Sequence, residues 1–223
     1  MDLEPPKDAW EDWANELYEQ GVACELTATL RIAYVDANGQ KTFRTITTEK
    51  FARTPDGGVV AAYCHMRQAR RPFRIDRVQF AAEPETGTRI DDLLGWLQQR
   101  YAGTTNGQRD VFMDRHADSI LALHHVAKAD GAVRAGERAI FQAFCQDVGP
   151  LSPEAAEAVV ALAAKMVQSS AIMYGRALKD LAERDEPYRR KVLQAAEAML
   201  GTDKAVKDAE RHALKRLREA LGL

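Results

Sequence analysis

The spacing of the apolar residues changes once along the chain, and this change limits the folds that the sequence can adopt. Between Cys24 and Phe80, apolar and polar residues alternate in short stretches rich in Thr, Ile, Val and aromatic residues, as in β-strands. After residue 108, apolar residues recur at intervals of three and four, as on one face of an α-helix. We therefore expect an α+β chain of two domains, with a sheet in the first and a helical bundle in the second.

Turn signals divide the first part into four or five short strands. The sequences "DANG" at residues 36–39 and "TPDGG" at residues 54–58 are typical of tight turns between antiparallel strands. Short strands joined in this way predict a small antiparallel β-barrel or curled sheet. We also expect one helix over residues 7–20 and another over residues 91–101, where apolar residues share a helical face.

The stretch "AGTTNGQ", residues 102–108, has the polar, glycine-containing composition of a linker. We place the first domain at residues 1–101, the linker at residues 102–109 and the second domain at residues 110–223. The helices expected in the second domain cover about residues 110–128, 135–147, 153–182 (with a possible break near Gly175), 187–200 and 206–221.

The helical part contains an internal repeat with a constant offset of 73 residues. Residues 129–149 align with residues 202–222, so that Asp130 matches Asp203 and Glu137 matches Glu210. A repeat of this kind predicts an all-α bundle built from a duplicated helical hairpin.

Each copy of the repeat has an acidic turn, which can be interpreted in two ways. Asp130, Gly131 and Glu137 match the second half of a helix-loop-helix calcium loop. The first half does not match, because Val126 and Lys128 occupy positions where carboxylates would stand. We favour a simple turn, in which Gly131 ends one helix and Glu137 lies in the first turn of the next. Weak binding of a divalent metal stays open, with the candidate ligands Asp130, Glu137, Asp203 and Glu210.

The net charge of −2 hides an uneven distribution of charge along the chain. Residues 1–23 contain one Lys against seven Asp and Glu, whereas residues 24–80 contain ten Lys and Arg against five acids. Much of the positive charge lies in "YCHMRQARRPFRIDRV", where arginines alternate with aromatic residues. Arginines beside aromatic rings are suited to bind phosphate or single-stranded nucleic acid. The candidate ligand-binding residues are Tyr63, Arg70, Arg71, Phe73, Arg74 and Arg77.

A second interpretation of the basic strand stays open. Charged residues at the edge of a sheet prevent pairing with other chains, and the acidic N-terminal segment could neutralise them.

Several classes of protein are disfavoured by what the sequence lacks. The three cysteines, Cys24, Cys64 and Cys145, are odd in number and widely spaced, which argues against a disulfide framework and against a paired-cysteine zinc site. The apolar stretches are shorter than the roughly 20 residues that span a bilayer, and the N-terminus lacks the features of a signal peptide. No nucleophile or cofactor motif is recognisable. We therefore expect a cytoplasmic protein that is not an enzyme and needs no cofactor.

Residues 28–97 resemble a WYL domain, a small SH3-like or Sm-like β-barrel of bacterial regulators. The resemblance depends on Ala62, Tyr63 and Cys64, followed by Arg71, Phe73, Arg74, Asp76 and Arg77. The Trp-Tyr-Leu triplet that names the family would fall on residues 58–60, which are Gly-Val-Val. The resemblance implies a ligand-sensing module that binds nucleotides or nucleic acid.

Residues 112–222 resemble the TerB-like domain of tellurite-resistance proteins, through the stretch "ALHHVAKADGAVRAGERAIF". The resemblance implies an all-α bundle with acidic turns, for which divalent metal binding has been suggested. Together the two resemblances imply a regulatory protein of bacterial stress or defence, whose barrel binds an anionic ligand such as a nucleotide or single-stranded nucleic acid. The alternative is a tellurite- or stress-resistance adaptor whose helical domain recruits protein partners.

Overall fold

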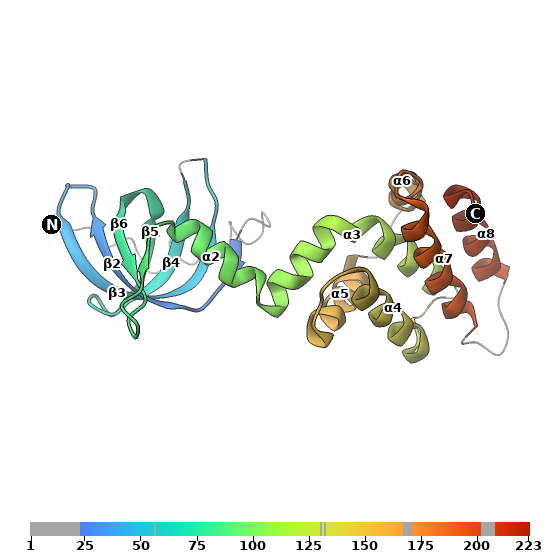
Figure 1. Ribbon diagram of the computed structural model, residues 1–223, viewed down its shortest axis with the longest axis horizontal. Coiled ribbons are helices and arrows are strands. Elements are labelled where there is room, and N and C mark those ends of the chain that lie inside the picture. The colour runs from blue at the N-terminus through green and yellow to red at the C-terminus, as the bar shows by residue number, and fades with distance from the viewer. Residues whose placement is uncertain (1–22, 56, 130, 132, 167–170, 202–207) are drawn as a thin grey trace. The chain divides into compact units, whose positions relative to one another are not determined.

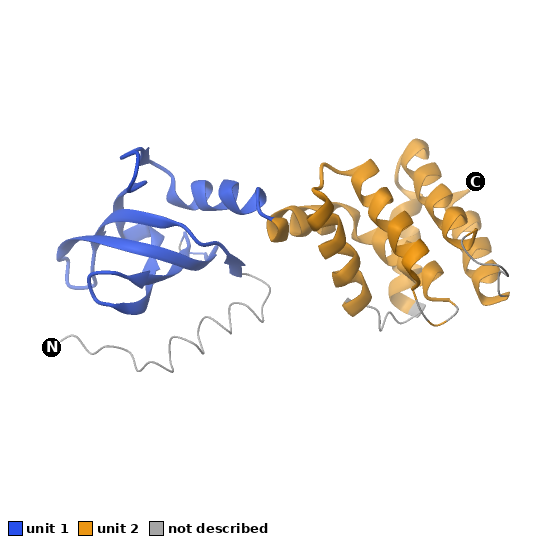
Figure 2. Ribbon diagram, turned by 90° about the horizontal axis from the view of Figure 1, so that it is seen from below, with its two compact units in different colours: residues 1–104 blue, residues 105–223 orange. Residues whose placement is uncertain are grey.

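The computed structural model describes residues 23–223 except residues 56, 130, 132, 167–170 and 202–207. The helix expected over residues 7–20 lies outside this range. The chain divides into two compact units, residues 1–104 and residues 105–223 (Figure 2). An antiparallel sheet dominates the first unit and helices form the second (Figure 1), which confirms the α+β class.

Within the described residues, seven antiparallel strands form the sheet of the first unit: β1 (Ala23–Glu25), β2 (Thr29–Val35), β3 (Lys41–Ala52), β4 (Val59–Cys64), β5 (Ala69–Arg74), β6 (Val78–Ala82) and β7 (Arg89–Ile90). Their spatial order is β5, β4, β3, β2, β6 and β7, and β1 pairs with the end of β3. The turn predicted at residues 36–39 joins β2 to β3. There the Asp36 side chain accepts hydrogen bonds from the N–H groups of Asn38 and Gln40, both at 2.9 Å, and Gly39 adopts a φ of +76°.

Strand β3 contains a β-bulge, because its register with β4 shifts between Thr48 and Lys50. Thr48 is fully buried and links β3 to the segment between β1 and β2. Its Oγ1 donates to the carbonyl of Leu26 at 2.6 Å and accepts from the N–H of Ala28 at 2.8 Å. The Thr48 hydroxyl thus provides hydrogen-bond partners for backbone groups of the segment between β1 and β2, which belongs to neither strand.

The sheet curls strongly enough to bring β5 close to β2. The rings of Tyr34 on β2 and Phe73 on β5 meet edge to face with centroids 5.2 Å apart, although β3 and β4 lie between these strands in the sheet order. In a flat sheet the two strands would be about 14 Å apart. Among the described strands no ladder joins β5 to β6 or β7, so the structure shows a curled sheet, and closure into an SH3-like or Sm-like barrel stays a prediction.

The inner face of the sheet and one helix enclose the core of the first unit. Helix α2 (Leu93–Ala102) follows the short 3-10 helix η1 (Ile75–Arg77), β6 and β7, and starts where the Asp92 side chain accepts the N–H of Gly95 at 2.9 Å. It adds Leu93, Leu97 and Tyr101 to a core made of Leu30, Ile32, Tyr34, Ile46, Phe51, Val60, Ala62, Cys64, Phe73 and their neighbours.

The stretch predicted as a linker is largely helical. Helix α3 (Thr105–Ala127) follows α2 closely, and only Gly103 and Thr104 separate the two helices. Two polar side chains of this stretch form hydrogen bonds, one to a distant segment and one within α3. Gln108 accepts the N–H of Ser152 at 2.8 Å, and Asn106 accepts from Arg109 at 3.0 Å.

The second unit consists of α3 and five further helices within the described residues: α4 (Ala135–Val148), α5 (Pro153–Met166), α6 (Ala171–Ala182), α7 (Glu186–Leu200) and α8 (Asp208–Leu221). The stretch predicted as one helix over residues 153–182 is described as α5 and α6, and residues 167–170 between them lie outside the described residues. Gly175, where a break was considered, lies inside α6 with open space around it. A glycine without close neighbours lowers helix propensity only modestly and does not end a helix.

Equivalent positions of the sequence repeat are buried alike in the second unit. Glu137 in the first turn of α4 and Glu210 in the first turn of α8 are both buried. Phe144 and Leu217, about two turns further along the same helix faces, are buried as well. These helices share one apolar core with α3, α5, α6 and α7. None of the helices in the described part of the chain combines the length and apolar character needed to span a bilayer.

Candidate functional site

The predicted basic strand is β5, and its pairing with β4 divides the candidate ligand-binding residues between two faces of the sheet. Tyr63 lies opposite Arg70, and both belong to the outer face because side chains alternate along a strand. Arg71 and Phe73 belong to the inner face, where Phe73 is only 2 % exposed and forms part of the core. Arginines and aromatic residues that are close in the sequence are therefore divided between the two faces.

The arginines of this strand are also engaged with carboxylates of the same unit. Arg70 Nε donates to Glu49 Oε1 at 3.0 Å. Arg74, on the outer face, binds both oxygens of Asp76 at 3.0 and 2.8 Å, and this hydrogen bonding lowers the pKa of the Asp76 carboxyl. Arg77 follows in η1 and is half-buried. The six candidates therefore do not gather on one face, and ligand contact through them stays a prediction.

Arg44 is a charged residue of the inner face that the sequence analysis missed. It lies on β3 on the same face as Ile46 and is only 8 % exposed. Its Nε donates to Thr42 Oγ1 at 2.9 Å, and its guanidinium lies 6.0 Å from the ring centroid of Tyr34 and 5.9 Å from that of Phe73. No Asp or Glu of the described residues forms an ion pair with it. The alternation in "KTFRTI" was the signal that could have identified this buried cation.

The outer face carries an exposed aromatic pair. Phe43 on β3 and Phe80 on β6 both lie opposite the buried Ala33 of β2, and they are 73 % and 38 % exposed. Lys41 Nζ lies 5.8 Å from the ring of Phe43, and the guanidinium of Arg89 lies 5.6 Å from the ring of Phe80. We call Phe43, Ala33 and Phe80 with these two cations the outer aromatic platform.

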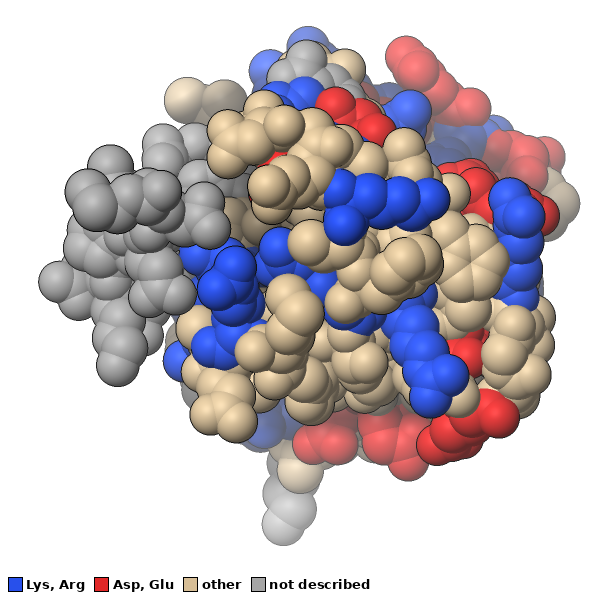
Figure 3. Space-filling model, turned by 90° about the vertical axis from the view of Figure 1, so that its left-hand side faces the viewer, with Lys and Arg blue, Asp and Glu red and all other residues tan. Residues whose placement is uncertain are grey.

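More positive charge lies close to the outer aromatic platform. Arg31, one outward-facing position before Ala33 on β2, is exposed opposite Thr45 and Ala82. Figure 3 views one side of the first unit: Lys and Arg spread over the middle of this face among uncharged side chains, and most Asp and Glu lie toward its margins. An open surface with exposed rings and nearby cations is suited to stack against flat, negatively charged ligands.

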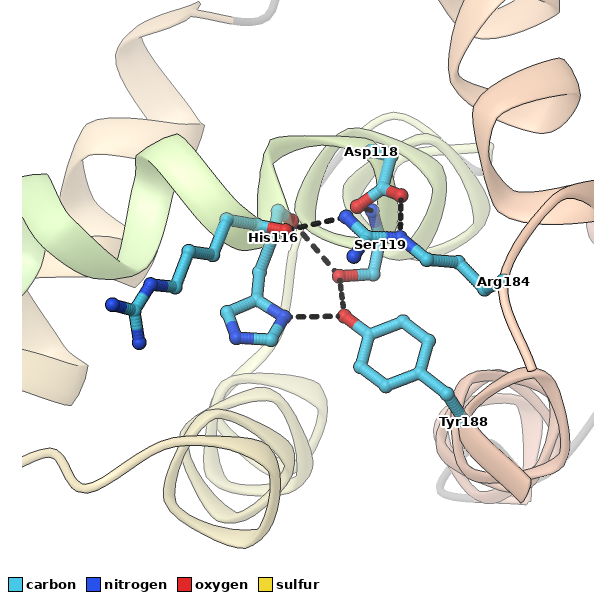
Figure 4. Close-up of polar contacts among 6 residues, drawn as sticks. His116, Asp118, Ser119, Arg184 and Tyr188 are labelled. Atoms are coloured by element: carbon cyan, nitrogen blue, oxygen red, sulfur yellow. Dashed lines mark hydrogen bonds and ion pairs between the residues drawn. The ribbon is translucent and has the colours of Figure 1, made fainter. Parts of the chain in front are cut away.

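A chain of polar side chains connects α3 to the start of α7 in the second unit (Figure 4). Ser119 Oγ donates to the carbonyl of His116 at 2.8 Å and lies 2.8 Å from the hydroxyl of Tyr188. The Tyr188 hydroxyl also lies 2.7 Å from His116 Nδ1. Because the Ser119 proton is used on the carbonyl, Tyr188 must donate to Ser119 and His116 Nδ1–H must donate to Tyr188.

This order of donors gives the network a structural role. Burial raises the pKa of Tyr188 to about 12 and lowers the pKa of His116, so both groups are neutral near pH 7. No base receives the proton of Ser119, because His116 contacts Tyr188 and not the serine hydroxyl. The geometry therefore lacks the activated hydroxyl of a nucleophilic serine.

An ion pair next to this network fixes the turn between α6 and α7. Arg184 Nε donates to the buried carboxylate of Asp118 at 2.8 Å, and Arg184 also donates to the carbonyl of Arg115 (Figure 4). The hydrogen bond to Asp118 raises the pKa of Arg184. The Arg184 guanidinium lies 5.4 Å from the ring of Tyr188, so the ion pair and the hydroxyl network form one contact region.

We expect Tyr188→Phe to lower the free energy of unfolding of the second unit by about 1–3 kcal/mol, because it leaves the polar atoms of Ser119 and His116 without their partner. Urea unfolding of the full chain, followed through NMR signals of the second unit, measures this loss. The matched control is Tyr63→Phe, which removes a hydroxyl from the other unit and should leave these signals unchanged. Equal midpoints for Tyr188→Phe and the wild type would contradict the role of the network.

The first acidic turn of the repeat leads into helix α4. Glu137 Oε2 accepts the N–H of Arg134 at 2.6 Å and so satisfies a backbone donor at the start of α4, which supports the interpretation as a helix start. Asp130 and Asp203 lie outside the described residues. Within the described residues no group of three or more His, Cys, Asp or Glu is placed to hold a metal ion. Metal binding by Asp130, Glu137, Asp203 and Glu210 therefore stays a prediction.

Comparison with known proteins assigns the second unit to a family. The family model described as "Tellurite resistance protein TerB" matches residues 116–223. The comparison with curated proteins and the comparison with solved structures give no match. The matched segment lies entirely within the second unit, so the resemblance of residues 28–97 to a WYL domain stays a prediction. Residues 116–223, with their buried helical repeat, form a TerB domain.

Proposed function

We propose that this chain is a non-enzymatic regulatory protein of a bacterial stress response, in which the first unit binds single-stranded nucleic acid and the TerB domain contacts protein partners. The TerB domain suggests a function related to tellurite resistance. The proposed binding surface is the outer aromatic platform with Arg31, extended across the sheet to Tyr63 and Arg70.

The observation that carries this proposal is the exposure of Phe43 and Phe80 beside cations. The Phe43 ring is 73 % exposed, so its burial within the folded chain contributes little to stability. A nucleobase can stack on the exposed ring. The two phenylalanines lie on strands separated by β2, and two strand spacings correspond to about 10 Å. A single nucleotide base is too small to contact both rings, so a strand of several nucleotides fits this surface better than a mononucleotide.

The test is the binding of the full chain to a short fluorescein-labelled oligothymidylate, measured by fluorescence anisotropy. We expect Phe43→Ala and Phe80→Ala each to weaken binding by roughly 5- to 150-fold, because stacking contributes about 1–3 kcal/mol per base. Val111→Ala, which shortens an exposed apolar side chain of the second unit, is the control and should bind like the wild type.

Salt dependence distinguishes stacking assisted by cations from a purely apolar contact. If Arg31, Lys41 and Arg89 each neutralise one phosphate, raising the NaCl concentration from about 50 to about 200 mM should weaken binding roughly twentyfold. Absence of binding at low salt, or binding that neither phenylalanine variant weakens, would contradict the proposed surface.

The adaptor function is the second candidate, and the TerB match favours it. In that case the phenylalanine variants should retain every protein partner that the wild type recruits, and the oligonucleotide should not bind. The same variants therefore separate the two functions.

A further inference from the structure

The outer aromatic platform and its surroundings contain two cations that form no ion pair within the described part of the chain. Arg31 on β2 and Lys41 on β3 are both exposed, and no described Asp or Glu pairs with either of them. Arg89, by contrast, pairs with Asp91 at 2.6 Å. Beside these cations the ring of Phe43 is 73 % exposed. This surface therefore fits a partner that carries both negative charge and flat apolar rings.

The segment that precedes β1 has both of these properties. Residues 1–22 contain seven Asp and Glu against one Lys. Trp10, Trp13 and Leu17 follow one another at intervals of three and four, so they share one face of the helix expected over residues 7–20. Carboxylates can pair with the cations that would otherwise bind phosphates, and indole rings can stack on phenylalanine as bases do. The segment thus resembles the ligand proposed for the platform in charge and in aromatic character.

The segment is long enough to reach the platform from the point where β1 begins. Ala23 pairs with Ala52 at one end of β3, and Phe43 lies nine positions earlier on the same strand. Nine steps along a strand correspond to about 30 Å. A segment of 22 residues spans about 33 Å as a continuous helix and about 75 Å when extended. Contact between the segment and the platform therefore requires no change in the sheet.

The basic strand β5 is the other surface that the acidic segment could neutralise, and it is the weaker candidate. Arg70 already binds Glu49, and Arg74 binds Asp76 through two hydrogen bonds. A carboxylate of the segment would have to compete with these partners on β5. At the platform, the two cations named above have no described carboxylate that would first be displaced.

We propose that residues 1–22 bind the outer aromatic platform of their own chain and compete there with single-stranded nucleic acid. Carboxylates of the segment pair with Arg31 and Lys41, and Trp10 and Trp13 pack against Phe43. The segment is covalently attached, so its effective concentration is high and weak contacts are enough to occupy the platform. The competition rests on the proposed function, whereas the docking of the segment does not.

The docking is tested without nucleic acid, by fluorine NMR of the full chain labelled with 5-fluorotryptophan. The chain has three tryptophans, and Trp96 on α2 serves as an internal reference. Lys41→Glu should shift the signals of Trp10 and Trp13 and leave that of Trp96 unchanged. Raising the NaCl concentration from about 50 to about 500 mM should shift them in the same direction, because salt screens exposed charges. The control is Lys179→Glu, which makes the same change of charge on an exposed residue of the TerB domain and should shift none of the signals.

Two results would overturn the docking. One is that the signals of Trp10 and Trp13 do not respond to Lys41→Glu, or respond equally to Lys179→Glu. The other is that their shifts grow with protein concentration, which would assign the contact to the segment of a second copy instead of the same chain.

The competition is tested with the fluorescein-labelled oligothymidylate. Neutralising four acids of the segment should tighten binding roughly 3- to 30-fold, as expected for the loss of two or three exposed ion pairs. The four substitutions are Asp8→Asn, Glu11→Gln, Asp12→Asn and Glu16→Gln. The control neutralises four exposed acids of the TerB domain, through Glu154→Gln, Glu157→Gln, Asp180→Asn and Glu183→Gln, and should change the affinity by less than about twofold.

Equal affinity of the wild type and the variant with the neutralised segment would overturn the competition. If neither protein binds the oligonucleotide, nucleic-acid binding and the competition fail together, and the fluorine signals still decide whether the segment docks.

Discussion

Between about pH 7.5 and pH 4.5 the TerB domain should lose roughly 2–3 kcal/mol of its free energy of unfolding, with His124 as the main cause. His124 is only 2 % exposed, and its Nδ1 has no hydrogen-bond partner among the described residues. Burial, with smaller contributions from Lys128 and His125, lowers its pKa from 6.5 to about 4. The unfolded chain therefore takes up a proton at a pH where the folded domain still excludes it.

This difference in pKa between the two states determines that stability falls as the pH is lowered. Well above pH 6.5 His124 is neutral in both the folded and the unfolded state and does not affect stability. As the pH falls through 6.5, protonation of the unfolded chain progressively favours unfolding until the folded pKa of about 4 is reached. The pKa values of His116 and His125 are also lowered, mainly by burial, so their effects have the same sign. His125 stacks on Tyr174 with ring centroids 3.8 Å apart, which leaves little room for a hydrated cation.

Urea unfolding of the full chain at several pH values, followed through NMR signals of the TerB domain, tests this prediction. His124→Leu should make stability much less dependent on pH, because the main titrating group is gone. The control is His212→Leu, which removes an exposed histidine of the same domain and should leave the pH dependence as it is. If His124→Leu retains the full dependence on pH, His124 is not its cause.

Phe73→Ala should lower the free energy of unfolding of the first unit by about 3–5 kcal/mol. The ring is almost fully buried, meets Tyr34 edge to face at 5.2 Å and lies 5.9 Å from the guanidinium of Arg44. Its removal leaves a cavity at the point where the curl of the sheet brings β5 to β2, and it also removes one of the two rings beside a buried cation. The buried position of Phe73 therefore predicts a structural role, in place of the ligand contact expected from the sequence.

Phe43→Ala provides a control with the same change of side chain. Phe43 is 73 % exposed on the opposite face of the sheet, so its loss should change stability by no more than about 0.5 kcal/mol. The measurement is urea unfolding of the full chain through NMR signals of the first unit, with the TerB signals as an internal reference. A cost for Phe73→Ala no larger than that of Phe43→Ala would show that the core described above is wrong.

Local signals in the sequence predicted most of the elements. The Asp36 turn, the strands on either side of it and the role of Glu137 at a helix start were all predictable, because each depends on residues a few positions apart. The helical start of α3 was missed because polar residues such as Gln108 bond to a segment far along the chain.

The candidate surface was harder to predict than the elements. Phe43 and Phe80 come together only because both strands pair with β2 around Ala33, and no periodicity within either strand specifies that register. Arg70 and Arg71 are adjacent in the sequence but belong to opposite faces, which period-two alternation alone could have indicated. The order of donors in the His116, Tyr188 and Ser119 network requires coordinates, because it joins α3 to α7.

The curled sheet separates residues that keep the protein folded from residues that can change in sequence during evolution. Along β2, residues such as Ile32 face the core while Arg31 and Ala33 face outward, and the same division applies to Arg44 and Phe43 on β3. Natural selection can therefore alter the outward set, and with it the preferred ligand, while the inward set keeps the chain folded. Homologues with a retained interior and a different exterior would be expected to share an architecture without sharing a target.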